Sequence, residues 1–109
     1  MLVYRQKLFD KATDFLDGGG NAVMKLSRKA AIDACLNAAP RGLVVVKIEG
    51  GIWRNGTFEA RLDAIWDGAD PPIEKENAGR NNLNAAEFIR CQDDTYNAFI
   101  LTAACVTGY

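Results

Sequence analysis

The sequence predicts an α+β fold in which two helices cover one face of a small, mainly antiparallel, three-stranded sheet. Apolar residues recur at helical spacing in two segments, and two strand-like runs lie between them. A third apolar run closes the chain. The 109 residues are enough for one modest core. The predicted order is therefore α-β-β-α-β, with a further helix in an N-terminal extension.

The extension comes first. Residues 2–16 carry apolar side chains at the spacing of one helix face, with charged residues between them. The apolar residues are Leu8, Phe9, Ala12, Phe15 and Leu16. This pattern predicts a helix of about fifteen residues, which needs other apolar surface to be stable in water. The run Gly18–Gly20 is expected to end it as a C-cap and flexible link.

Ser27 is expected to cap a second helix, which runs to about Ala39 and ends at Pro40. Its predicted buried stripe consists of Ile32, Cys35, Leu36 and Ala39. The β-branched run that starts at Leu43 predicts a central strand to Glu49, which Gly50-Gly51 is expected to break.

Asn55-Gly56 is a strong turn signal. From Thr57 to Trp66 apolar and polar residues alternate, which predicts a half-buried antiparallel strand. The side chains expected to face inward are Phe58, Ala60, Leu62, Ala64 and Trp66. The other face is charged, and a loop from Asp67 to Pro72 follows.

Asn81 or Asn82 is expected to cap a third helix that runs to about Asp93. Its predicted inner residues are Leu83, Ala86, Phe88 and Ile89. The apolar, β-favouring run over residues 96–106 is expected to form a closing strand in the interior of the sheet.

Composition narrows the function. The chain has no histidine, so the commonest general base and metal ligand are missing, and no motif predicts a catalytic, metal or cofactor site. The three cysteines, Cys35, Cys91 and Cys105, are expected to be buried free thiols. No apolar run is long enough to span a bilayer and the start lacks a signal-peptide core, so we expect a cytoplasmic protein without membrane contact.

Charge is concentrated in one stretch, although the net charge is only −1. Between residues 63 and 76, five carboxylates accompany one cation, Lys75. They are Asp63, Asp67, Asp70, Glu74 and Glu76. Glu49, Trp53 and Trp66 lie near the same predicted hairpin. Aromatic anchors with a charged rim are typical of protein interfaces, so this stretch is a candidate surface for a basic partner.

Three alternatives stay open at this point. Exposed acids are common, and the inward register of Trp66 also fits a simple core position. Glu49, Asp63 and Asp67 could converge in a small carboxylate-dependent hydrolase. A homo-oligomeric structural module could use the apolar last strand as an edge.

Four segments carry a family resemblance: MKLSRKAAIDACLNAAPRGL, KIEGGIWRNG, NNLNAAEFI and YNAFILT. Over residues 24–106 the chain resembles the immunity protein of the tRNA-cleaving E-type colicin, the colicin E-five immunity family. The resemblance divides the chain into an extension, residues 1–23, and an immunity domain, residues 24–109. The chain departs most from the family pattern between Thr57 and Glu76.

The resemblance implies an antitoxin and no enzyme. Such a protein binds the C-terminal ribonuclease domain of its own toxin as a 1:1 heterodimer, and that domain cuts tRNA within the anticodon. It fills the substrate cleft with groups that imitate RNA, and it contacts no nucleic acid directly. By position, the cleft-filling group would be Asp63, Trp66, Asp67 and Asp70, and the rim would be Glu49, Trp53, Glu74 and Glu76. The toxin would belong to a bacteriocin or to a contact-dependent inhibition system.

Overall fold

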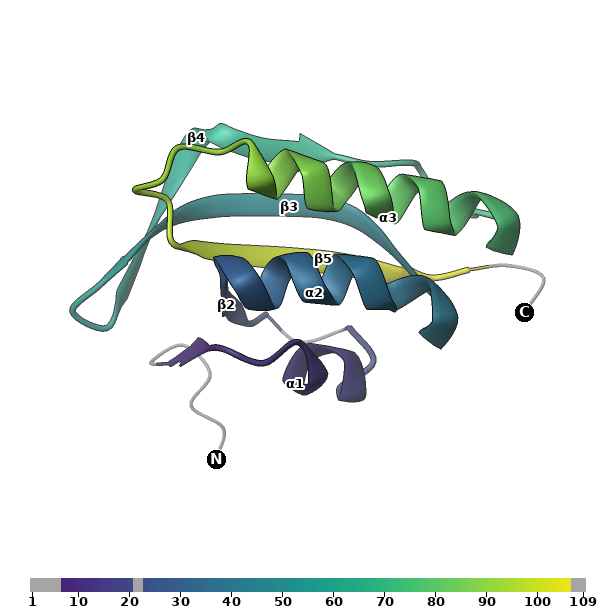
Figure 1. Ribbon diagram of the computed structural model, residues 1–109, viewed down its shortest axis with the longest axis horizontal. Helices are drawn as coiled ribbons and strands as arrows, with labels where there is room; N and C mark the ends of the chain where they lie inside the picture. The colour runs from purple at the N-terminus through teal and green to yellow at the C-terminus, as the bar shows by residue number, and fades with distance from the viewer. Residues whose placement is uncertain (1–6, 21–22, 107–109) are drawn as a thin grey trace.

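The computed structural model describes residues 7–20 and 23–106, and Figure 1 shows their arrangement. Two short elements, β1 (Leu8–Phe9) and α1 (Ala12–Asp17), come first. The remaining order is β2 (Lys25–Ser27), α2 (Arg28–Ala38), the 3-10 helix η2 (Ala39–Arg41), β3 (Leu43–Arg54), β4 (Thr57–Asp67), α3 (Lys75–Arg90) and β5 (Ala98–Cys105). The predicted α+β class is confirmed.

The sheet has five strands in the order β1-β2-β5-β3-β4, where three were predicted. β3 is antiparallel to β4 and β5, β2 is antiparallel to β5, and β1 is parallel to β2. The two strands missed span two and three residues, which is too short for an alternating pattern to show. β5 lies inside the sheet as predicted, so it offers no free edge to a second copy.

The long helix predicted over residues 2–16 is wrong for its described part. Leu8 and Phe9 form β1, and the helix that follows has only six residues; residues 2–6 lie outside the described part. The apolar residues of this segment are nevertheless buried as predicted: Phe9, Phe15 and Leu16 belong to the main core. The glycines end α1 as expected, with the N–H of Gly19 donating to the Leu16 carbonyl at 3.0 Å.

α2 begins at its predicted cap, since the Ser27 hydroxyl accepts from the N–H of Ala30 at 3.2 Å. The predicted stripe is wrong at Leu36, which is 40% exposed. The helix is buried instead through small residues, Ala30, Ala31, Ala34, Cys35 and Ala38. Small side chains let α2 pack closely against α3 and the sheet. A pattern of large apolar residues does not reveal this kind of buried face.

β3 does not break at Gly50-Gly51 but continues to Arg54, so that prediction is wrong. The predicted Asn55-Gly56 turn is confirmed, with φ of 56° and 75°. Both residues adopt the left-handed conformation that a tight hairpin requires. In β4, Ala64 is buried and Trp66 half-buried as predicted, but Ala60 and Leu62 are exposed.

α3 starts at Lys75, six residues before the predicted cap at Asn81. Asn81 and Asn82 bond to β3 instead, because β4 ends opposite Lys47 and leaves the edge of residues 43–45 without a strand partner. Leu83, predicted to be buried, is 59% exposed, while Ala86 and Ile89 are buried as expected.

Helices α2 and α3 cover one face of the sheet, and the main core lies between them and the strands (Figure 1). Cys35 belongs to this core, and burial raises the pKa of its thiol to about 12. Cys91 and Cys105 are free but exposed, so the prediction of burial is wrong for both. Within the described residues, no helix is long and apolar enough to cross a membrane.

Candidate interaction surface

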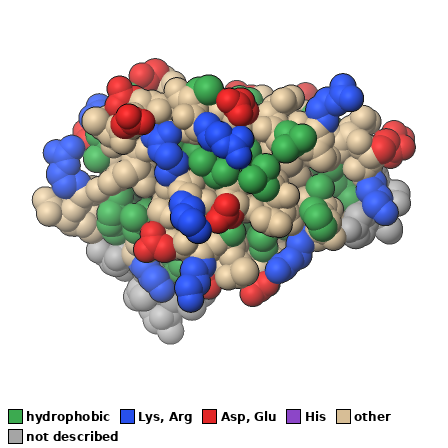
Figure 2. All heavy atoms as spheres, in the orientation of Figure 1, with side chains coloured by type: hydrophobic (Ala, Val, Ile, Leu, Met, Phe, Trp, Pro, Cys, Tyr) green, Lys and Arg blue, Asp and Glu red, His purple; other side chains and the backbone are tan. Residues whose placement is uncertain are grey.

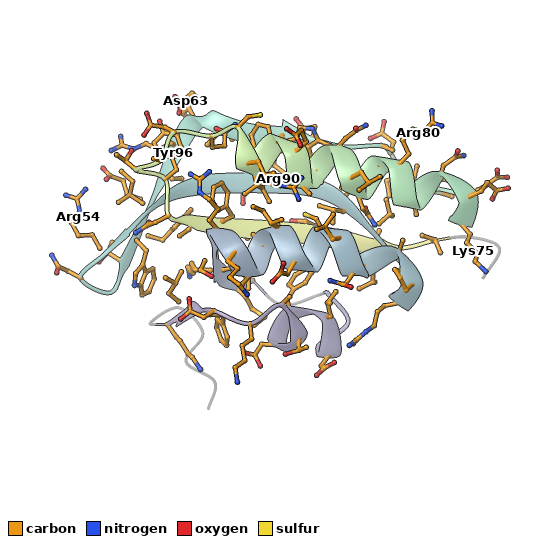
Figure 3. The ribbon with its side chains drawn as sticks, viewed as in Figure 1. Arg54, Asp63, Lys75, Arg80, Arg90 and Tyr96 are labelled. Atoms are coloured by element: carbon orange, nitrogen blue, oxygen red, sulfur yellow. The ribbon has the colours of Figure 1, made fainter. Side chains whose placement is uncertain are left out.

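The predicted acidic residues form a row along one margin of the molecule, not a compact cluster. Asp63 and Asp67 lie on the edge strand β4, Asp70 lies in the following loop, and Glu74 and Glu76 lie at the start of α3; all five are exposed. Asp63 and Lys75, which stands between the two glutamates in sequence, are far apart in Figure 3.

The charges of this row are available to a partner. The ion pairs among the described residues are Lys29–Asp33, Arg41–Asp17, Arg61–Glu59 and Arg90–Glu87. Within residues 7–20 and 23–106, no cation pairs with Asp63, Asp67 or Asp70. Figure 2 shows basic and acidic side chains interspersed over the helix-covered face, and both kinds also stand along its upper edge, where β4 runs. The carboxylates of this margin that lack a paired cation favour a basic partner.

Asp63 is held in place by a residue from another element. The hydroxyl of Tyr96 lies 2.8 and 3.0 Å from the two carboxylate oxygens of Asp63 (Figure 3). This hydrogen bond raises the pKa of Tyr96. Because Tyr96 belongs to the segment between α3 and β5, the contact ties β4 to that segment.

Arg28 at the start of α2 fixes the same segment. Its guanidinium donates to the carbonyls of Ile89, Gln92, Asp93 and Tyr96 at 2.8, 3.3, 2.5 and 2.7 Å. Three of these carbonyls lie at or just beyond the end of α3, where a cation also meets the negative end of the helix dipole. Arg28 thus positions Tyr96, and through it Asp63.

The loop that carries Asp70 is anchored at its start, directly after β4. The N–H of Gly68 donates to the Val46 carbonyl at 2.9 Å. The N–H of Ala69 donates to Oδ1 of Asn81 at 3.0 Å, and Nδ2 of Asn81 donates to the Val45 carbonyl at 2.7 Å. Asn81 therefore links the acidic loop to α3 and β3 together.

Trp66 lies on the helix-covered face. Its partner on β3 is Ile48, a core residue, and its ring centroid lies 6.4 Å from that of Phe88 on α3. A side chain at Gly68 would meet the Trp66 ring at 2.7 Å, which explains the glycine. Trp66 is half-buried, so it contributes to packing and keeps part of its surface accessible.

Trp53 and Glu49 lie elsewhere on β3. Asn97 holds Trp53, accepting from its N–H at 2.7 Å and donating to its carbonyl at 3.2 Å. A shallow pocket at this end of the hairpin is lined by Ile52, Arg54, Thr57, Phe58 and Glu59. Glu49 is half-buried and faces away from the helices, because the next residue back, Ile48, faces the core.

The structure thus brings some predicted residues together and separates others. Asp63, Asp67 and Asp70 share the β4 margin. Trp53 lies near the hairpin end of β3, whereas Trp66 pairs with Ile48 in the middle of that strand, so the two do not form one aromatic cluster. Sequence reasoning missed Tyr96, Arg28 and Leu62, and the only signal for the last was the unexplained Gly50-Gly51 pair. Among the described residues, no group of three or more Cys, Asp or Glu side chains could hold a metal ion.

Comparison with known proteins adds an independent observation. The family model described as "Colicin-E5 Imm protein" matches residues 24–104. The chain is 51% identical over 104 residues to the immunity protein CdiI of Burkholderia pseudomallei, covering 95% of each chain. It is 41% identical over 80 residues to the colicin-E5 immunity protein of Escherichia coli, covering 72% of this chain and 96% of that protein. The CdiI match extends into the segment before residue 24 that the family model leaves out.

Proposed function

The chain belongs to the colicin-E5 immunity protein family, and on this premise we propose that it blocks the active-site cleft of a cognate tRNA-cleaving toxin domain. Membership in this family supports the antitoxin function, because an immunity protein binds its cognate toxin. The proposal concerns the finer points, namely a 1:1 complex with a C-terminal ribonuclease domain, formed without catalysis, and acidic groups that take the place of RNA.

The observation that supports this proposal most is the exposed acidic row on β4 and its loop, which lacks ion-pair partners within the described chain. A cleft that binds RNA must be basic to hold phosphates. Carboxylates held at fixed positions can occupy such a cleft as phosphates do, and complementary charge speeds association. Asp63, Asp67 and Asp70 are the residues we assign to this contact.

The other predicted residues keep lesser roles in the proposal. Glu74 and Glu76 extend the row past the start of α3, and Glu49 lies on the helix-free face. The accessible part of Trp66 adjoins Asp67 and can stack against a group in the cleft. Trp53, held by Asn97 near the hairpin end of β3, is assigned a rim contact.

The test is charge reversal with a matched control. The double variant Asp67→Lys, Asp70→Lys is expected to weaken binding to the toxin's ribonuclease domain by several kcal/mol, because two desolvated contacts turn repulsive. The control, Asp10→Lys with Asp14→Lys, changes the net charge equally in the exposed part of the N-terminal segment, beside the opposite edge of the sheet. Affinity is measured by titration calorimetry, and protection by a tRNA cleavage assay.

Equal affinities of the two double variants would discard the assigned surface. Tight binding without inhibition of cleavage would discard the cleft-blocking mechanism while leaving the antitoxin function in place.

A further inference from the structure

Leu62 is the most exposed large apolar side chain of the described residues. It is 88% exposed, against 65% for Val23 and 59% for Leu83. It stands on β4 between Arg61 and Asp63, in a position that the alternating pattern assigns to the core. An exposed leucine contributes no burial to the fold, so its placement calls for another explanation.

A bulge in β4 causes this placement. Glu49 pairs with Ile65 and Gly51 pairs with Ala60, so the four residues 61–64 of β4 lie opposite the single residue Gly50. Bulges of this kind turn side chains to a new direction. Ala64 still faces the core, whereas Leu62 projects to solvent.

Gly50 and Gly51 make the bulge possible. A Cβ at Gly50 would meet Phe99 at 2.8 Å and Ala64 at 3.0 Å. A Cβ at Gly51 would meet the backbone carbonyl oxygen of Glu59 at 2.2 Å. Gly50 and Gly51 therefore allow β4 to approach β3 closely, and they do not break the strand.

The bulge is held in a fixed conformation. Tyr96 binds Asp63 from one side, and Arg28 fixes the segment that carries Tyr96. Arg61, on the other side of Leu62, is half-buried, and its Nη2 lies 3.4 Å from Glu59. A projecting side chain on a fixed support loses little conformational freedom when it binds, which favours affinity.

We propose that Leu62 is the apolar anchor of the toxin interface and enters a small apolar pocket beside the cations that meet Asp63. This inference rests on the proposed function and adds the residue that fills the centre of the contact. The occupant is the ribonuclease domain and not a second copy of this chain. Leu62 adjoins Asp63 and the acidic row, whose aspartates Asp63 and Asp67 have no cation partner among the described residues, so its surroundings complement the basic cleft of an RNA-cutting domain.

The test compares two exposed leucines. Leu62→Ala and Leu83→Ala remove the same atoms, but Leu83 is an exposed residue of α3 and not of β4. Binding is measured by surface plasmon resonance on the C-terminal ribonuclease domain of the cognate toxin. Leu62→Ala is expected to weaken binding about 10- to 30-fold, mainly through faster dissociation, because burial of the leucine side chain is lost. Leu83→Ala is expected to bind like the wild type.

Thermal unfolding is measured in parallel, and both variants are expected to melt with the wild type because both side chains are exposed. If the wild type binds and Leu62→Ala binds equally well, the anchor is refuted and the proposed function stands. If the wild type does not bind the ribonuclease domain, the proposed function is refuted along with the anchor. A wild-type dimer that Leu62→Ala converts to a monomer would assign the side chain to self-association and also overturn the inference.

Discussion

Asn82 offers the sharpest test of how the acidic margin is supported. The residue is 2% exposed and replaces a missing strand partner for β3. Its Oδ1 accepts from the N–H of Val45 at 2.9 Å, and its Nδ2 donates to the Leu43 carbonyl at 3.1 Å. In Asn82→Ala both backbone groups lose these bonds in a site from which water is excluded.

The cost follows from these two bonds. A buried polar group left without a partner costs about 1 to 3 kcal/mol, so the loss of two should lower the free energy of unfolding by about 3 kcal/mol. For a domain of this size that corresponds to a fall in Tm of about 12 °C. Asn84→Ala is the matched control, since Asn84 is exposed on the same helix. Its Tm is expected to stay within about 2 °C of the wild type.

A second variant separates the hydrogen bonds from the volume. Asn82→Asp keeps the acceptor for Val45 but places a carboxylate against the Leu43 carbonyl. Burial favours the neutral form of the introduced carboxyl group, so its pKa is higher in the folded state than in the unfolded state. The variant therefore loses stability as the pH rises from the unfolded-state pKa through the folded-state pKa. Urea unfolding at pH 4 and pH 7 measures the difference. We claim that the Asn82 side chain takes the place of a strand partner for β3. An Asn82→Ala variant whose free energy of unfolding lies within 1 kcal/mol of the wild type, or an Asn82→Asp variant whose stability does not depend on pH, would refute this claim.

Three further outcomes are expected. At pH 8 a thiol reagent should modify the two exposed cysteines quickly, and Cys35 only on unfolding, because burial raises the pKa of its thiol to about 12; three fast thiols would contradict the burial. In an absorbance titration Tyr96 should ionise above the ordinary pKa of a tyrosine, and Tyr96→Phe should remove that late step. The raised pKa of Tyr96 means that its hydrogen bond to Asp63 is kept below pH 10 and lost as the pH rises through the folded-state pKa. A chain that starts at Met24 should still fold and neutralise the toxin. It should melt at a lower temperature, because it lacks the core side chains of residues 7–20. Aggregation or lost protection would contradict this prediction.

The sequence predicts what depends on local pattern. The cap at Ser27, the turn at Asn55-Gly56 and the interior position of the last strand all follow from short-range propensities, and the structure confirms them. The family assignment, which depends on motifs, is confirmed as well.

The errors share a different cause. The local pattern predicts Asn82 as a helix cap because its real partner, Val45, lies 37 residues away in sequence and is open to it only because β4 has already ended. The alternating pattern predicts Leu62 in the core because it assumes that each residue of β4 pairs with one residue of β3. In the bulge, four residues of β4 lie opposite one residue of β3, and the alternation is lost. Both features are long-range, and a period of two or 3.6 residues carries no information about them.

The acidic surface lies between these two cases. Its members were found from composition alone, and their exposure is as expected. Their arrangement in a row along β4 and the start of α3, rather than around one hairpin, depends on the length and direction of α3. The contacts of these residues with a toxin stay a prediction.

The strand order has a practical consequence for anyone who labels this protein. β1 and β4 form opposite borders of the sheet, separated by four strand spacings, or about 19 Å. A fluorescent reporter or an affinity handle fused ahead of β1 would therefore stand well clear of the acidic row on β4 that we propose as the toxin contact. A handle inserted at the β3–β4 hairpin would not.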